Sequence, residues 1–345
     1  MLPAVPWWWT VRTRIVTNIR KDAPQPPNRA DELRAELGQQ IARFMGPAEN
    51  LSTGIPGLTL HRRTAPTAPL SVTYEPGVAV VVQGRKQVEL GRTTFIYDAS
   101  QFLLTSLDLP VVSRVIEASE ELPYMCFRLR FEVPLVSELL SRGEIPRTQV
   151  PLNGPAMATS ETSVELLGAC SRLMTLLNTP QDIPFLSDAI QREIIYRILQ
   201  SPEGQRLRAI ATQGDQNQRT AKAIAWIREN YAKPLSVEDL ARLSGMGVST
   251  LHTHFRELTS MSPLQYQKQL RLQAARIRML TDGLDAATAA FEVGYGSATQ
   301  FNREYSRLFG QPPKRDVRTL RAPGALSLEL VGEKPFAHPS HNRLP

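Results

Sequence analysis

The chain is poor in the residues that form disulfides and metal centres. Among its 345 residues only Cys126 and Cys170 are cysteines, and they lie far apart without a metal-binding spacing, so neither a disulfide framework nor a zinc site is expected. His61 is the only histidine before His252, whereas metalloenzymes built on small β-barrels hold their ion through closely spaced histidines and a carboxylate. The composition therefore predicts no cofactor, argues against metal catalysis and fits a reducing cytoplasm.

A long apolar segment is also missing. The opening stretch "MLPAVPWWWTVRTRIVTNIRK" has three tryptophans but no apolar run of signal-peptide length, and its basic residues follow the apolar ones. We expect neither export nor a membrane span, and we interpret residues 1–30 as a disordered leader that ends in proline-rich sequence. An interfacial anchor formed by the three tryptophans is the alternative. Residues 322–345 combine mixed polarity with several prolines and are also predicted to be disordered.

Positive charge is concentrated in the last third of the chain. Between Arg219 and Arg321 there are sixteen Lys or Arg and nine Asp or Glu residues, an excess of seven that equals the net charge of the whole chain, +7. A basic segment of this kind is the electrostatic footprint of a nucleic-acid-binding domain, although a solvated face explains many charge runs.

The basic segment contains one pattern twice. "GMGVSTLHTHFRELTSMSP" (residues 245–263) and "GYGSATQFNREYSRLFGQPP" (residues 294–313) each have a glycine turn, a helical stretch with an inward aromatic residue, and a proline. A repeated period usually marks a repeated structural unit, and two copies favour a paired module over a solenoid. The matching residues stand fifty positions apart: Leu251 and Phe301, Phe255 and Tyr305, Leu258 and Leu308, and Pro263 and Pro313.

The first copy has the signals of a helix-turn-helix over residues 236–258. Ser236 stands three residues before Asp239, which is the spacing of a capping box at a helix start. Gly245 ends this helix where a left-handed backbone is needed, and residues 248–258 resume helical spacing. Helix, glycine turn and helix together predict the motif. The outer face of its second helix would present Ser249, Thr250, His252, Thr253 and Arg256.

The second copy repeats these signals over residues 285–309, where Ser297 and Gln300 form another capping box. A helix over residues 263–280 is predicted to join the copies and would span about 27 Å, close to the roughly 34 Å between successive major grooves. Arg271 and Arg276 on this helix could contact phosphates, although cations on a solvated helix face are common. The outer face of the second reading helix would present Ala298, Thr299, Gln300, Asn302 and Arg303, which include side chains that pair with base edges.

The N-terminal half has a different sequence pattern. From Ile55 to Phe131, short alternating apolar runs are separated by glycines, which is typical of an all-β sandwich or barrel, and a small barrel can enclose one ligand. Arg85 and Lys86 are expected in a solvated hairpin turn. By alternation, the candidate pocket residues are Tyr74, Val80, Val82, Phe95, Tyr97 and Phe102, although ordinary core packing explains each of them as well.

Two amphipathic helices and a linker are expected after the strands. Residues 162–178 carry a leucine stripe and residues 185–200 an isoleucine stripe, and this helix pair (162–200) would cover the barrel or pack on itself. Residues 213–219 are polar, lack an apolar anchor and are interpreted as the interdomain linker. The expected organisation is an N-terminal domain over residues 31–212 and a DNA-binding domain over residues 220–321.

Both halves resemble one known family. "LARLSGMGVSTLHTHFRE", "SPLQYQKQLRLQAARIRML" and "AFEVGYGSATQFNREYSRLFGQPP" resemble the DNA-binding domain of the AraC/XylS-type transcription regulators. "APLSVTYEPGVAVVVQGRKQVELG" and "LLTSLDLPVVSRVIEAS" resemble the cupin-like N-terminal domain of one AraC-type subgroup. The resemblance implies an α+β protein in which a cupin-like β-barrel with flanking helices precedes an all-α double helix-turn-helix domain.

The resemblance also implies roles for individual residues. Gly247 stands where relatives usually place Ser at the helix cap. Thr253 stands where Arg is common. Arg303 is therefore expected to carry more of the discrimination between DNA bases, which is worth roughly 1–3 kcal/mol for a bidentate pair. The base-reading positions would be Ser249, His252, Thr253, Ala298, Thr299, Gln300 and Arg303. The phosphate contacts would be Thr250, Arg256, Arg271, Arg276 and Asn302.

The predicted function is sequence-specific transcription regulation without enzymatic activity, and activation is favoured over repression. The partners implied are double-stranded DNA, RNA polymerase and a small-molecule effector or protein at the barrel, with a homodimer through the helix pair as a further hypothesis. Three alternatives stay open: an enzyme with an appended DNA-binding tail, a nonspecific architectural protein, and a regulator whose barrel serves only dimerisation or protein contact.

Overall fold

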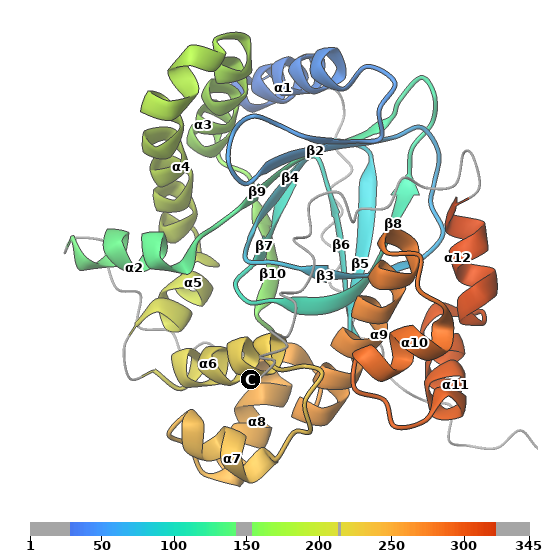
Figure 1. The fold of residues 1–345 in the computed structure, drawn as a ribbon. Coiled ribbons are helices and arrows are strands. Elements are labelled where there is room, and N and C mark those ends of the chain that lie inside the picture. The colour runs from blue at the N-terminus through green and yellow to red at the C-terminus, as the bar shows by residue number, and fades with distance from the viewer. Residues whose placement is uncertain (1–27, 143–153, 213–214, 322–345) are drawn as a thin grey trace, which may run out of the picture.

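A β-barrel built of two sheets lies at the centre of the protein (Figure 1). The computed structural model describes residues 28–142, 154–212 and 215–321. In the view of Figure 1, helices from the first part of the chain lie above and to the left of the barrel, and the helices of residues 216–321 lie below and to the right. This architecture confirms the predicted α+β class. The predicted tail and the predicted leader lie outside the described residues, except for residues 28–30.

A helix that the sequence analysis missed, α1 (Arg29–Met45), opens the described chain. Asn28 accepts a hydrogen bond from the Asp31 N–H at 3.1 Å, and the Asp31 carboxylate reaches back to the Asn28 N–H, which completes a capping box. Leu37 and Ile41 are fully buried where the helix packs on the barrel. The ordered N-terminal domain therefore already includes residues 28–30, which were predicted to belong to the leader.

Ten strands in two antiparallel sheets form the described barrel: β1 (Asn50–Ser52), β2 (Leu58–Arg63), β3 (Leu70–Tyr74), β4 (Gly77–Gln83), β5 (Arg85–Leu90), β6 (Thr93–Asp98), β7 (Gln101–Thr105), β8 (Leu109–Glu117), β9 (Tyr124–Arg130) and β10 (Met157–Glu161). One sheet has the order β1-β2-β9-β4-β7-β10 and the other β3-β8-β5-β6. Side chains such as Val80 and Phe127 from the first sheet and Val88 and Leu109 from the second are fully buried. Val82 and Met125, on the face of the first sheet that also carries Val80 and Phe127, lie within 4 Å of the Cβ position of Gly38 in α1. The core of the N-terminal domain therefore has two parts, one between the sheets and one between the first sheet and α1.

Lys86 is not solvated, contrary to the expectation from the sequence. The turn between β4 and β5 is made by Gly84, whose φ of +80° suits glycine, so Arg85 already belongs to the strand. Alternation along β5 then directs Lys86 inward. It is only 6% exposed, and its ammonium lies 5.5 Å from the ring centroid of Tyr74 and 5.9 Å from that of Tyr124.

Four helices accompany the later strands: α2 (Val133–Ser141), α3 (Val164–Thr175), α4 (Ile183–Gln200) and α5 (Gly204–Ala211). The predicted helix pair corresponds to α3 and α4, which pack against each other, and α3 also packs against α1. The α-helix α3 ends earlier than expected, and a 3₁₀ turn covers Leu176–Asn178. Ile194, Ile195 and Ile198 of the predicted isoleucine stripe are buried, whereas Phe185 and Leu186 near the start of α4 are exposed.

Seven described helices make up the C-terminal domain: α6 (Gln216–Glu229), α7 (Val237–Leu243), α8 (Val248–Thr259), α9 (Pro263–Thr281), α10 (Ala286–Glu292), α11 (Ala298–Phe309) and α12 (Pro313–Arg321). The pairs α7–α8 and α10–α11 stand at the predicted places of the two helix-turn-helix units, and α9 joins them. Residues 216–219 of the predicted linker are helical, because α6 begins at Gln216 behind a cap formed by Asp215.

Candidate nucleic-acid interface

The first helix-turn-helix presents its second helix, α8, at the surface. Ser236 caps α7 by accepting a hydrogen bond from the Asp239 N–H at 3.1 Å. Gly245, with a φ of +66°, turns the chain toward α8, and Gly247 precedes α8 without a side chain that could cap it. The outer face of α8 is polar and accessible: Ser249, Thr250, Thr253 and Arg256 are exposed, and His252 is half-exposed.

The second helix-turn-helix repeats this arrangement with side-chain caps on both helices. Asp285 caps α10 by accepting hydrogen bonds from the N–H groups of Thr288 at 3.0 Å and Ala287 at 2.9 Å, which lower the pKa of its carboxyl. The Ser297 hydroxyl accepts a hydrogen bond from the Gln300 N–H at 3.3 Å and caps α11. On the outer face of α11, Thr299, Gln300, Asn302 and Arg303 are exposed, and Ala298 is half-exposed.

Glu304 holds α11 against the rest of its domain. This buried carboxylate accepts hydrogen bonds from the Lys268 ammonium of α9 at 2.9 Å and from the Tyr295 hydroxyl at 2.9 Å. Burial alone would raise the pKa of Glu304, but these hydrogen bonds and a third from Gln300 outweigh it, so the pKa is lowered. Because Glu304 lies one turn after Gln300, the anchor fixes the orientation of the face that carries the predicted base-reading residues.

Two arginines that the sequence assigned to phosphate contact lie inside the domain. The guanidinium of Arg276 is buried and forms hydrogen bonds of 2.8 and 2.9 Å with Asp316. Arg271 donates to the carbonyl oxygens of Tyr231 at 2.7 Å and Gly294 at 2.9 Å. Helix α9 is packed against its own domain and against strands β3 and β8, so a phosphate role for these two arginines does not fit their placement. The other predicted phosphate contacts, Thr250, Arg256 and Asn302, are exposed.

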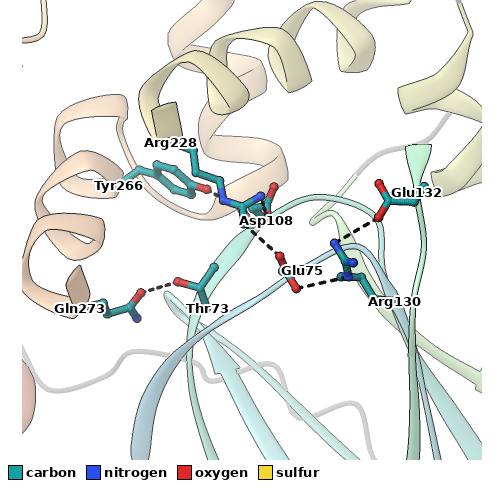
Figure 2. A network of polar contacts seen from close by, with 8 residues as sticks. All are labelled: Thr73, Glu75, Asp108, Arg130, Glu132, Arg228, Tyr266 and Gln273. Carbon is teal, nitrogen blue, oxygen red and sulfur yellow. Dashed lines mark hydrogen bonds and ion pairs between the residues drawn. The ribbon is translucent and has the colours of Figure 1, made fainter. Parts of the chain in front are cut away.

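A polar interface joins the C-terminal domain to one end of the barrel (Figure 2). Arg228 of α6 forms ion pairs with Glu75 at 3.0 Å and with Asp108 at 2.7 Å. The Tyr266 hydroxyl of α9 donates a hydrogen bond to the Asp108 carbonyl oxygen at 2.7 Å. Burial raises the pKa of the Asp108 carboxyl to about 6, although the charge of Arg228 opposes this shift. A charged and partly desolvated cluster thus connects the two domains.

Further contacts attach α8 and α9 to the barrel. The Thr73 hydroxyl of β3 donates a hydrogen bond to the Gln273 side chain of α9. The Ala156 N–H donates to the carbonyl oxygen of Leu258 at the C-terminal end of α8, at 2.9 Å. The barrel therefore contacts the end of α8 that lies away from its exposed N-terminal turns.

The predicted pocket residues are only partly brought together. A cavity of about 20 Å³, enough for one water molecule, is bordered by Tyr74 and Tyr97 of the predicted set. Within the described chain, Val80, Val82, Phe95 and Phe102 do not border it. Val80, Val82 and Phe102 lie on the other face of the first sheet, toward α1. Alternation separates the two faces of a strand without showing which one borders the cavity. The sequence analysis had not selected the ionisable residues His61, Glu75, Lys86 and Arg128 as pocket residues, although they also line the cavity.

The interface residues Arg228, Glu75 and Asp108 were also missed. They belong to three separate segments of the chain, and no local spacing relates a carboxylate in a strand connection to an arginine more than a hundred residues later. Only the fold brings them together, so the sequence held no signal that could have found them.

Within the described residues, no helix is long and apolar enough to cross a membrane. In the same residues, no group of three His, Cys, Asp or Glu side chains is arranged to hold a metal ion. Both cysteines are buried, and no disulfide joins them in this part of the chain.

Comparison with known proteins connects this geometry to a family. Residues 54–206 match the AraC-type transcriptional regulator N-terminus, and residues 240–319 match a helix-turn-helix domain. The HTH-type transcriptional regulator ExsA of Pseudomonas aeruginosa is 25% identical over 266 residues, which are 76% of this chain and 94% of ExsA. The HTH-type transcriptional activator RhaS of Yersinia pestis is 30% identical over 105 residues, which are 30% of this chain and 38% of RhaS.

Solved structures share the fold. The structure of unsaturated fatty acid bound ToxT from Vibrio cholerae has a TM-score of 0.51 and 10% identity, and covers 75% of this chain and 94% of ToxT. Another ToxT structure has a TM-score of 0.52 at 10% identity and covers 77% and 98% of the two chains. A barrel domain followed by two helix-turn-helix units with accessible second helices defines a two-domain DNA-binding transcription regulator. Since both halves match in the family's order, the chain belongs to the AraC/XylS-type transcription regulators.

Proposed function

We propose that α8 and α11 choose the DNA site through the outer faces of their N-terminal turns. The observation that carries this proposal is that both helices keep a polar face exposed while Leu251 and Phe255 in α8, and Phe301 and Tyr305 in α11, are fully buried. In helix-turn-helix proteins the N-terminal residues of the second helix contact base edges in the major groove. The proposed base-reading residues are Ser249, His252, Thr253, Ala298, Thr299, Gln300 and Arg303.

Phosphate contacts are proposed to position the protein without selecting the sequence. Thr250, Arg256 and Asn302 are exposed beside the base-reading residues and are suited to this role. Arg271 and Arg276 are left out of the proposal, because their guanidinium groups already bind carbonyl oxygens and a buried carboxylate inside the domain.

The barrel is proposed to be the regulatory domain, which binds a small molecule or a protein and thereby controls DNA binding. ToxT, which shares the fold, was crystallised with an unsaturated fatty acid, and this supports a small-molecule effector here. Such a ligand acts only if its affinity differs between two arrangements of the domains, and the polar interface around Arg228 is the structural element whose state it would change. We propose activation, through contact with RNA polymerase, because the relative RhaS is an activator.

A homodimer through α3 and α4 is proposed as the assembled form. Phe185 and Leu186 of α4 are 80% and 47% exposed, which is unusual for large apolar side chains on a helix that buries Ile194, Ile195 and Ile198. We propose no enzymatic activity for the chain, and we propose that it acts in the cytoplasm, where its DNA target lies.

The test of base reading compares Arg303→Ala with Arg307→Ala, which removes the same charge one turn further along the exposed face of α11. Affinities are measured for the cognate site and for variants with single base-pair changes. Arg303→Ala should weaken the cognate complex by about 1–3 kcal/mol and relax the preference at one base pair. Arg307→Ala should weaken all sequences to a similar extent. Uniform weakening by Arg303→Ala would show instead that Arg303 contacts only phosphate.

A further inference from the structure

An open groove of about 270 Å³ lies next to the polar interface. It is lined by residues 52–59, which run from the last residue of β1 to the first residues of β2, and by Glu75, Arg128 and Arg130. Glu75 and Arg130 are visible in Figure 2, where Glu75 stands between Arg130 and Arg228. Arg128 and Arg130 are two residues apart on β9, so both side chains project from the same face of the sheet.

The two arginines of the groove differ in their partners. Arg130 forms ion pairs with Glu132 at 3.1 Å and with Glu75 at 3.8 Å. Arg128 is half-buried, and its guanidinium lies 5.2 Å from the ring centroid of Tyr74. No ion pair joins Arg128 to a carboxylate within the described ranges. Stacking holds the guanidinium in place and removes part of its hydration, which favours pairing with an anion.

The remaining walls of the groove suit a small organic ligand. Ile55 and Leu58 provide an apolar floor, and the N–H groups of Gly54 and Gly57 donate no hydrogen bond in the described chain. A fixed cation, free backbone donors and an apolar floor together match a small molecule with one anionic group. We propose that this groove binds a small anion whose carboxylate or phosphate oxygens pair with Arg128.

Glu75 connects the proposed site to the DNA-binding domain. One carboxylate oxygen of Glu75 faces Arg130 and the other pairs with Arg228 of α6. Docking of α6 on the barrel therefore brings a further positive charge, that of Arg228, close to the groove that already holds Arg128 and Arg130. An anion in the groove has a higher affinity for the docked arrangement than for a separated one, because the attraction to Arg228 is present only when the domains are docked. By thermodynamic linkage the anion stabilises the docked arrangement to the same degree.

This inference rests on the proposed regulatory role of the barrel and names the chemistry of the ligand. Its test is calorimetric titration of the full-length protein, without DNA, with hexanoate, with uncharged hexanamide and with inorganic phosphate. Hexanoate and phosphate distinguish a carboxylate with an apolar body from a bare oxyanion, and hexanamide keeps the shape of hexanoate without its charge. The variants are Arg128→Gln and, as the matched control, Arg62→Gln on β2, which removes an arginine outside the groove.

We expect hexanoate or phosphate to bind and hexanamide to bind at least tenfold more weakly than hexanoate. Arg128→Gln should weaken anion binding at least tenfold, whereas the control Arg62→Gln should leave it unchanged. Arg228→Gln should weaken anion binding several-fold, although the Arg228 side chain does not contact the anion, because the charge near the groove is lost. No binding of either anion at concentrations up to about 10 mM, or equal binding by wild type and Arg128→Gln, overturns the site. Since no DNA is present, that result leaves the proposed DNA-binding function untouched.

Discussion

Removal of Arg228 tests whether the polar interface holds the two domains together. In the variant Arg228→Ala, the carboxylates of Glu75 and Asp108 lose ion pairs of 3.0 and 2.7 Å. Removing one partner of a buried ion pair costs roughly 3–5 kcal/mol, but the Arg228 side chain is 32% exposed, so solvent screens the pairs and the cost is lower.

Two features limit the cost further. Burial has already raised the pKa of Asp108 to about 6, so without Arg228 this carboxyl can be neutralised at pH 7 for about 1.4 kcal/mol or less. Glu75 also retains its ion pair with Arg130. We therefore expect Arg228→Ala to lower the free energy of unfolding by about 2 kcal/mol, which corresponds to a fall of about 4–8 °C in the melting temperature.

The assay is thermal unfolding at pH 7, followed by circular dichroism. The control is Arg242→Ala, since Arg242 is an exposed arginine whose ion pair with Asp239 at 2.9 Å lies within α7, and this variant should change stability by less than about 0.5 kcal/mol. Equal melting temperatures for Arg228→Ala and Arg242→Ala would refute the reasoning. Equal resistance of the two variants to proteolysis near residues 213–214 would lead to the same conclusion.

Three further predictions concern pH and the interior of the DNA-binding domain. Because burial in the folded protein raises the pKa of Asp108 from its ordinary value of 3.8 to about 6, the folded state binds the proton more tightly than the unfolded state, and the free energy of unfolding should fall as the pH rises from 4 through 6. Asp108→Asn should remove most of this dependence in pH-resolved melting curves. Asp316→Ala leaves the buried guanidinium of Arg276 without its carboxylate and should lower the free energy of unfolding, measured by chemical denaturation, by about 3 kcal/mol. A decrease below about 1 kcal/mol would show that solvent reaches Arg276. Gly294→Ala would place a Cβ atom 2.1 Å from the Ala232 carbonyl oxygen, at a position whose backbone φ is +89°. We therefore expect at least about 2 kcal/mol of destabilisation. An unchanged melting temperature in this variant would contradict the close contact.

The C-terminal domain was the more predictable half. Its helices carry their own boundary signals, such as the Ser236 and Ser297 caps and the glycine turns at Gly245 and Gly294, and these local signals act over a few residues. The predicted starts and ends of the reading helices therefore agree with the structure. What the sequence did not reveal is that α9 is buried on two sides, and this tertiary contact makes Arg276 a structural residue.

The barrel was predictable as a class and not in its details. Alternation identified the strands, but it placed Lys86 in a solvated turn, because the position of the turn depends on the positive φ of one residue, Gly84. The capping box at Asn28 was visible in the sequence, yet the neighbouring prolines favoured a disordered leader. The proposed anion groove joins β9 to the loop before β2, and such a long-range arrangement has no local sequence signature.

The central claim is that two exposed reading helices select a DNA sequence. The most direct test measures binding of the full-length protein to DNA from the region upstream of its own gene and to scrambled DNA of equal length, across a series of salt concentrations. Selection by α8 and α11 predicts a strong preference for the upstream fragment that persists at about 0.15 M salt. Equal affinities for both fragments, which decline together as salt rises, would mean that only phosphate attraction operates and would contradict the claim.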